Sequence, residues 1–226
     1  MHYHYHILLA QTPAAGGPVI NNFAVHRYKH DQALKADATA AAIGEEVHTF
    51  VDISTSGGKN LSWTGTGLPP VRSNGFVSIG SATDIEWLNN TVTPIAQPYE
   101  YWLVMQNETG NDSFVYIQST GFKIQGATSN LRIDCGLQVD FSGANPPNGV
   151  TKILRIVVNG ASSGLYTNNV AHVSNPQNLG ADSLSNFKIG NPGGGAIWSF
   201  KEVFITGALS SADANDVYNE LATEYL

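Results

Sequence analysis

The sequence predicts an all-β fold: a sandwich of two antiparallel sheets in one domain, with a short C-terminal helix. Only 13% of the 226 residues are charged, whereas an average soluble protein has about 25%. Gly, Ser, Thr and Asn are abundant, which favours strands and turns over long helices. From about residue 76 onward, short apolar runs alternate with turn signals at the spacing typical of a sandwich.

The predicted strands are separated by turns that contain asparagine or glycine. Asn159-Gly160 is the clearest turn, because Asn-Gly after a β-branched run is the preferred sequence of a tight hairpin. Between residues 131 and 141, apolar and polar side chains alternate, which predicts a single strand with one buried face. That face consists of Leu131, Ile133, Cys135, Leu137 and Val139. The predicted strands are residues 76–79, 99–105, 114–118, 122–125, 131–141, 153–158 and 197–205.

Two segments have helical features. Residues 31–47 are rich in alanine, with Asp37 and Thr39 as candidate N-caps, and are compatible with a short helix or helical turn that ends near Gly44. Residues 210–213 form a capping box, Ser-Ser-Ala-Asp, and the apolar positions that follow recur every four residues. The second segment predicts the C-terminal helix, which packs on the sandwich.

Charge and cysteine content exclude several kinds of partner and site. The formal net charge of −7 argues against binding to nucleic acid or to anionic membranes. Cys135 is the single cysteine, so an intrachain disulfide and a multi-cysteine metal site are both excluded. The apolar run at residues 7–10 is too short for the core of a signal peptide or for a membrane span, so we expect neither export signal nor membrane insertion.

Residues 1–30 do not follow the sandwich pattern. Histidine and tyrosine alternate at the start, which would place imidazoles on one strand face and phenols on the other. The alternating residues are His2, Tyr3, His4, Tyr5 and His6. A stretch rich in proline and glycine follows at 11–18 and indicates a linker. We interpret residues 1–30 as an assembly arm of a homo-oligomer, joined to a domain at 31–226.

The same histidines raise a metal hypothesis, although the fold requires no cofactor. His2, His4 and His6, repeated around a symmetry axis, could ligate a transition metal. An exposed edge strand is the simpler interpretation. Farther along, Arg27 and Lys29 lie between His26 and His30 and predict a solvated basic turn.

Several segments, taken in order, resemble the laminin-G-like, concanavalin A-like lectin and glucanase superfamily, in the form found in bacteriophage structural and adhesion proteins. Residues 47–60, VHTFVDISTSGGKN, are similar to a W-x-D-x-SG-N opening, with Phe50 in place of Trp and with Thr55-Ser56 interrupting the Ser-Gly pair. Residues 74–88 loosely resemble the next strand, and residues 97–105, QPYEYWLVM, match a Q-P-F-T-x-x-x-V strand. The best match is in the C-terminal third, at residues 153–160, 187–190 and 195–213.

The resemblance implies a two-sheet jelly roll over residues 45–226, but it leaves the function open. The superfamily contains glycan binders, glucanases, lyases and structural modules. A retaining glucanase of this fold requires a Glu-x-Asp-x-x-Glu strand, and the sequence has none; Asp84 and Glu86 are its nearest pair. It also lacks a Gly-x-Ser-x-Gly elbow, a His-Glu-x-x-His motif and a phosphate loop. We therefore predict that the chain is not an enzyme.

Glycan binding requires less, namely an exposed aromatic ring with polar groups beside it. Three aromatic residues lie in turn-rich, polar surroundings, and the alternative for each ring is packing at the rim of the core. The candidate residues are Trp63, Trp87, Asn89, Asn90, Tyr166 and Asn168. Trp102, in the middle of a predicted strand, and Trp198 are assigned to the core.

We expect a non-enzymatic structural or adhesion module that binds a cell-surface polysaccharide or glycan. A surface of extracellular type without an export signal fits a virion protein, which is released by lysis, and its other partners would then be virion proteins. An extracellular location would also fit if a signal had been removed. The alternatives are a purely structural capsid, fibre or tail component and, less favoured, a polysaccharide-degrading enzyme.

Overall fold

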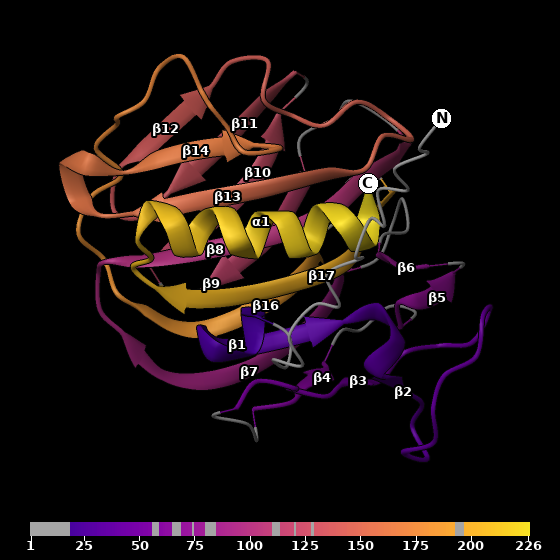
Figure 1. The fold of residues 1–226 in the computed structure, drawn as a ribbon. Coiled ribbons are helices and arrows are strands. Elements are labelled where there is room, and N and C mark those ends of the chain that lie inside the picture. The colour runs from indigo at the N-terminus through magenta and orange to yellow at the C-terminus, as the bar shows by residue number, and fades with distance from the viewer. Residues whose placement is uncertain are drawn as a thin grey trace, which may run out of the picture.

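The computed structural model describes residues 19–226 except for residues 56–58, 65–68, 74, 80–84, 110–113, 120, 128 and 193–196. In parts of the strands beside these gaps it describes the backbone alone. Within the described residues, two antiparallel sheets pack face to face, and one α-helix lies across the outside of one of them (Figure 1). The predicted all-β sandwich with a short C-terminal helix is confirmed.

Sheet A is centred on two long strands. Its strands are β1 (Ala24–Lys29), β5 (Val71–Ser73), β6 (Phe76–Ile79), β8 (Tyr99–Thr109), β13 (Lys152–Val158), β14 (Gly164–Thr167), β15 (Val170–Ala171) and β17 (Ile197–Gly207). The order is β15-β14-β13-β8-β17-β6-β5, and β1 also pairs with β17. Because β15 pairs with β14 alone, it forms one edge of the sheet.

Sheet B forms the second layer. Its strands are β2 (Ala33–Leu34), β3 (Thr49–Phe50), β4 (Leu61–Trp63), β7 (Ile85–Ile95), β9 (Phe114–Ser119), β10 (Phe122–Ala127), β11 (Asn130–Asp134), β12 (Gln138–Phe141) and β16 (Leu184–Pro192). The order is β12-β11-β10-β9-β16-β7-β4-β3-β2, so β12 and β2 form opposite edges. Three short 3-10 helices, η1 (Val19–Asn22), η2 (His30–Gln32) and η3 (Gly160–Ser162), complete the described elements.

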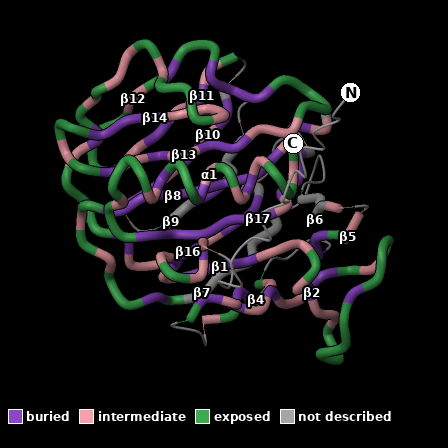
Figure 2. Tube along the Cα trace, viewed as in Figure 1, coloured by how far each residue is buried: buried purple, intermediate pink, exposed green. Residues whose placement is uncertain are grey.

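The core has two parts, because β8, β13 and β17 are covered on both faces (Figure 2). The larger cluster lies between the sheets and contains Trp198, as predicted. The smaller cluster lies on the outer face of sheet A, beneath α1 (Ser211–Tyr225), and contains Trp102. Trp102 is therefore a core residue, as predicted, but it packs against the helix rather than between the sheets.

The C-terminal helix begins at the predicted cap. The side chain of Ser210 accepts a hydrogen bond from the backbone N–H of Asp213 at 3.2 Å. Val217 and Leu221 are buried against sheet A. The capping box and the four-residue spacing were thus sufficient to predict this element.

The predicted single strand at 131–141 is wrong. Residues 131 and 133 pair with residues 141 and 139, so the segment is a hairpin of β11 and β12 rather than one strand. Gly136 has a φ of +91°, a backbone conformation that favours glycine and allows the chain to reverse. Leu131, Ile133 and Cys135 are buried, but Leu137 lies in the turn and is 50% exposed.

The short helix or helical turn predicted to end near Gly44 does not form; the helical structure at 31–47 is limited to η2 at the start of the segment. The segment contains η2 and β2, followed by irregular backbone. The carboxylate of Asp37 accepts hydrogen bonds from the backbone N–H and the hydroxyl of Thr39, at 3.0 and 2.6 Å. Such local side-chain bonds compete with helix formation, and a segment this short has little helical stability to oppose them.

Residues 19–30, expected to lie outside the sandwich, are part of it. Ile20 in η1 is buried beneath α1, and β1 pairs with β17 in antiparallel register. An arm of this chain is therefore confined to residues before Val19. Residues 1–18, with His2, Tyr3, His4, Tyr5 and His6, lie outside the described residues, so the arm and its metal hypothesis stay predictions.

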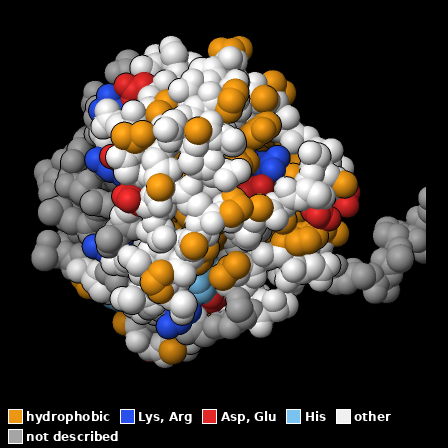
Figure 3. Space-filling model, turned by 90° about the vertical axis from the view of Figure 1, so that its left-hand side faces the viewer, with side chains coloured by type: hydrophobic (Ala, Val, Ile, Leu, Met, Phe, Trp, Pro, Cys, Tyr) orange, Lys and Arg blue, Asp and Glu red, His pale blue; other side chains and the backbone are white. Residues whose placement is uncertain are grey.

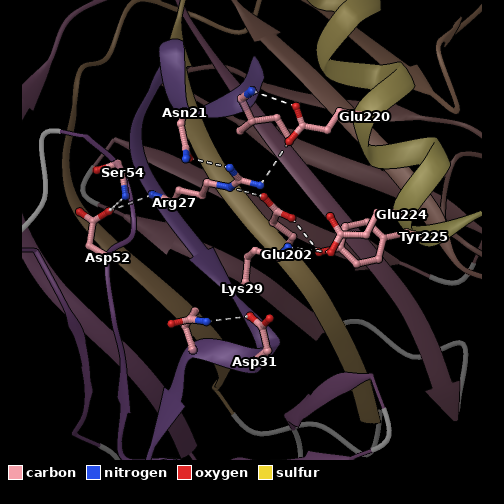
Figure 4. Close-up of polar contacts among 12 residues, drawn as sticks. Asn21, Arg27, Lys29, Asp31, Asp52, Ser54, Glu202, Glu220, Glu224 and Tyr225 are labelled. Atoms are coloured by element: carbon pink, nitrogen blue, oxygen red, sulfur yellow. Dashed lines mark hydrogen bonds and ion pairs between the residues drawn. The ribbon is translucent and has the colours of Figure 1, made fainter. Parts of the chain in front are cut away.

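The predicted solvated basic turn around Arg27 is a buried strand. Arg27 is 2% exposed, and its Nε lies 2.6 Å from Oε1 of Glu202, which is fully buried. Its guanidinium also donates to Asn21 at 2.6 Å and approaches Glu220 at 3.6 Å (Figure 4). These contacts connect β1 to β17 and α1, and partners so distant in sequence were not visible in the local charge pattern.

Candidate functional site

A groove of about 440 Å³ lies at the open side of the sandwich. It lies where β12, the edge of sheet B, faces the β14–β15 edge of sheet A, in the upper part of Figure 1. Its volume is in the range of small-ligand pockets. The lining residues are Ser142, Gly143, Ala144, Asn145, Pro146, Pro147, Lys152, Thr167, Val170, Ala171, His172 and Val173.

The groove continues the space between the two sheets. Residues directly opposite each other in antiparallel strands share a face. Lys152 is opposite Met105, and Thr167 is opposite Leu154, and both of these partners belong to the core between the sheets. Lys152 and Thr167 therefore occupy core-facing positions at the point where the core opens to solvent.

His172 joins the two walls of the groove. Its Nε2 donates to the carbonyl oxygen of Ser142, just after β12, at 2.9 Å. Its Nδ1 accepts from the backbone N–H of Ser174 at 3.2 Å, and the ring contacts Phe141 edge-on at 5.3 Å between centroids. This pattern corresponds to the neutral tautomer with the proton on Nε2. Both ring nitrogens are used in fixing the wall, so His172 is a positioning residue.

Asn107 holds the other end of the loop that follows β12 and lines the groove. Its side-chain nitrogen donates to the carbonyl oxygen of Pro146 at 2.6 Å, and its own carbonyl accepts from the N–H of Gly149 at 2.7 Å. Asn107 is fully buried. The loop after β12 is thus fixed at both ends, which gives the groove a preformed shape.

The charged groups of this lining are few. Of the described residues that line the groove, Lys152 and His172 have ionisable side chains, and none is acidic. The side of the molecule at the left of Figure 1 likewise presents scattered hydrophobic side chains and few charged ones (Figure 3). The described lining therefore contains no pair of carboxylates of the kind that glycoside hydrolysis uses.

Two of the predicted glycan-binding residues flank the groove without lining it. Tyr166 lies in β14, where its half-buried ring stacks with the guanidinium of Arg155 at 4.9 Å on the outer face of sheet A. Asn168 has a φ of +48°, and its side chain accepts from the N–H of Ile153 at 3.0 Å. Both residues support the hairpin that presents Thr167 and Val170 to the groove.

Trp63 packs against the core. It is half-buried in β4, touches the main core cluster and contacts the His48 ring edge-on at 5.6 Å. Its indole Nε1 is buried and has no hydrogen-bond partner among the described residues. This placement corresponds to the rim-packing alternative considered for each ring.

The remaining candidates are in β7. Asn89 is opposite Ser62 of β4 and Lys188 of β16, and Trp87 is opposite Gly190. The structure describes the backbone of Trp87, Asn89 and Asn90, and their side chains lie outside what it describes. The fold therefore brings residues 62–63 and 88–89 onto adjacent strands, whereas Tyr166 and Asn168 belong to the other sheet.

The sequence analysis missed the groove, although one signal was present. In β13, Leu154, Ile156 and Val158 form an apolar alternation that is buried in the core. Lys152 is in phase with them and interrupts the alternation with a charge. A polar residue at a core-facing position would have indicated an opening there.

Further structural features bear on metal binding and membranes. Within the described residues, no group of three or more His, Cys, Asp or Glu side chains is placed to hold a metal ion. The same residues include no helix of the length and apolarity needed to span a bilayer.

The chain is similar in fold to several solved structures at low sequence identity. The binding domain of botulinum neurotoxin serotype D matches with a TM-score of 0.57 and 17% identity, over 88% of this chain and 52% of that one. Trypanosoma rangeli sialidase in complex with sialic acid matches with a TM-score of 0.61 and 9% identity, over 90% and 33%. The exoplasmic or lumenal domain of VIP36 matches with a TM-score of 0.50 and 7% identity, over 82% and 93%.

These likenesses define the fold class, a lectin-like β-sandwich. The chain spans about half the length of the neurotoxin binding domain and a third of the sialidase. No protein-family model matches the sequence, and no curated protein matches it either.

Proposed function

We propose that the chain is a non-enzymatic, glycan-binding module whose binding site is the groove between β12 and the β14–β15 hairpin. The observation that supports this most directly is the preformed groove, in which core-facing positions carry a lysine and a threonine instead of apolar residues. Rigid walls and a mixture of apolar and polar lining are the usual features of a small-ligand site.

The fold comparisons are compatible with this proposal. Similar folds occur in a neurotoxin binding domain and in a sialidase that was solved with sialic acid. For this chain, binding without catalysis is favoured because the described groove lining contains no carboxylate.

A blocked groove tests the proposal. Val170 is 70% exposed and lies opposite Thr167, on the groove-facing side of the β14–β15 hairpin, so Val170→Trp should fill the groove without disturbing the core. Ile43, which is 64% exposed in the loop after β2 at the opposite edge of sheet B, provides the control Ile43→Trp. On a glycan array, the unmodified chain and Ile43→Trp should retain the same glycans, and Val170→Trp should lose them. Equal retention by all three would place the site elsewhere.

The β7 side chains are a second candidate for the same function. If Trp87 is a sugar platform, Trp87→Ala should abolish glycan retention with little change in melting temperature, because an exposed ring contributes little to stability. Trp63→Ala should lower the melting temperature, because Trp63 packs against the core. Full retention by Trp87→Ala would exclude this candidate.

We further propose that the module works on the outside of a phage particle, as part of a homo-oligomer that contacts other virion proteins, or alternatively in another extracellular assembly. The few charges and the composition of the surface support this location. The alternative is a structural capsid, fibre or tail component without a ligand. An array on which the unmodified chain retains no glycan, together with its presence in purified particles, would favour that alternative.

A further inference from the structure

We infer that the groove accepts an acidic saccharide and that Lys152 provides its ionic contact. This inference rests on the proposed function, because it names the chemical class of the ligand for the same groove. Three features of the described residues support it: the position of Lys152, the charge of the groove lining, and the apolar side chains at the rim of the groove.

The position of Lys152 is unusual for a lysine. It is the first residue of β13, half-buried, and in phase with Leu154, Ile156 and Val158 on the core-facing side. A charged side chain at such a position loses hydration unless a partner of opposite charge compensates. A ligand that brings an anionic group into the groove would supply that partner.

The described residues do not supply that partner. Within the described part of the chain, no carboxylate is in ion-pair contact with Lys152, and no described lining residue is acidic. Elsewhere, basic side chains are commonly paired with a nearby carboxylate. Examples are Arg27 with Glu202, Lys29 with Glu224, Lys35 with Glu45, Arg132 with Asp140 and Arg155 with Glu100.

The absence of a carboxylate from the described lining matters because the whole chain is acidic, with a net charge of −7. A lining with one lysine and no carboxylate is locally positive in a molecule that otherwise repels anions. Charge complementarity therefore selects an anionic ligand at this groove.

The rim selects a ring-bearing ligand over a simple inorganic anion. Val170 and Val173 are 70% and 97% exposed on one wall, and Pro146 and Pro147 line the loop that forms the other. Apolar side chains of this kind contact the C–H faces of sugar rings, while a threonine hydroxyl and a lysine can bond to substituents. The described lining thus matches a sugar that carries a carboxylate, sulfate or phosphate.

Calorimetric titration with matched oligosaccharides tests this assignment. The probes are a galacturonate tetramer, a sulfated galactose tetramer and the neutral galactose tetramer. We expect the unmodified chain to bind at least one acidic probe at least about tenfold more tightly than the neutral one, and added salt to weaken that preference. Comparison of the two acidic probes distinguishes a carboxylate ligand from a sulfate ligand.

Two pairs of variants locate the contact. Lys152→Gln should lower affinity for the preferred acidic probe by about tenfold, whereas Lys123→Gln, the same charge change in β10 of sheet B, should not. In case Lys152→Gln perturbs folding, Val170→Asp adds a carboxylate to an exposed, groove-facing position and should weaken acidic binding, relative to Val170→Asn, without affecting the neutral probe.

The outcomes separate this inference from the proposed function. If the array shows that the chain binds only neutral glycans, or if Lys152→Gln and Lys123→Gln behave alike and Val170→Asp matches Val170→Asn, the assignment of an acidic saccharide is wrong and the glycan-binding proposal stands. If no saccharide of either charge binds, the proposed function itself is wrong.

Discussion

Arg27 and Glu202 form the most deeply buried ion pair among the described residues. Tyr225 also donates to the Glu202 carboxylate at 2.7 Å. Burial raises the pKa of the Glu202 carboxyl, and the guanidinium of Arg27 opposes that shift. Arg27 thus compensates the buried charge of Glu202, and each member of the pair depends on the other.

Removing one member of this ion pair should therefore lower the free energy of unfolding substantially. We predict that Arg27→Met lowers the free energy of unfolding by about 3–5 kcal/mol, because it leaves Glu202 buried without its partner. Arg132→Gln, which breaks the exposed pair with Asp140, should cost no more than about 1 kcal/mol. Denaturant unfolding measures both, and similar losses for the two variants would contradict this account of the buried pair.

Asp52 holds the neighbouring loop through three hydrogen bonds. Burial pushes the pKa of its carboxyl upward, but hydrogen bonds from His26, Ser54 and the backbone of Arg27 outweigh burial and lower it below its ordinary value. A carboxyl with a lowered folded-state pKa stabilises the fold above its unfolded pKa, and that contribution is lost as pH falls through the folded value.

Asp52→Asn should therefore change the pH dependence of stability. At neutral pH we expect the variant to be less stable than the unmodified chain. The difference should shrink below about pH 4, where the unfolded carboxyl titrates. Chemical unfolding across this pH range measures the difference, and a gap that stays constant down to strongly acidic pH would contradict the prediction.

Ile133 is fully buried in β11 and belongs to the core between the sheets. Ile133→Ala should destabilise the chain by about 2–5 kcal/mol, because it removes buried methyl groups and leaves a cavity.

Burial also raises the pKa of the nearby Cys135 thiol, so this thiol should react slowly in the native state. Rapid labelling of native Cys135 would show that this part of the core is open.

At the scale of secondary structure, local sequence patterns predicted strands correctly where the prediction did not depend on which strand lies alongside. The residues predicted at 76–79 coincide with β6, and those at 99–105 and 153–158 lie within β8 and β13. β13 and β14 do form a hairpin at Asn159-Gly160, but the predicted tight turn is wrong: residues 159–163 make the connection and include η3, and Asn159 has a φ of −151° while Gly160 has +52°. Strand alternation and turn chemistry are properties of neighbouring residues, so they can be read locally.

The cap of α1 offers a test at this scale. Ser210→Ala should destabilise the chain by about 0.5–2 kcal/mol, because it leaves an N–H of the first turn without its acceptor. Ser211→Ala, one residue into the exposed first turn, is the matched control and should have little effect. Equal melting temperatures for the two variants would show that the cap contributes nothing beyond the packing of Val217 and Leu221.

At the scale of the whole molecule, the N-terminal region divides into two parts. Residues 19–29 complete sheet A and the layer beneath α1, whereas residues 1–18 are the candidate arm. Deleting residues 1–18 should leave a folded sandwich that no longer joins its oligomer. Deleting residues 1–29 should abolish folding, because it removes β1 and leaves Glu202 unpaired.

Thermal unfolding and light scattering measure these outcomes. The full-length chain is the reference for both deletions. If the chain without residues 1–18 assembles as before, the arm is dispensable, and if it fails to fold, the segment belongs to the domain.

The sequence by itself determined the all-β class, the positions of β6, β8, β9, β10, β13 and β17, and the cap of the C-terminal helix. Each depends on periodicity or on contacts within a few residues. The tertiary structure alone decided that residues 131–141 fold back as a hairpin, that Arg27 is buried, and that Lys152 faces a groove. These features depend on which segments become neighbours. β1 pairs with β17, and the end of β12 contacts His172 after β15, only after the chain has folded across long separations.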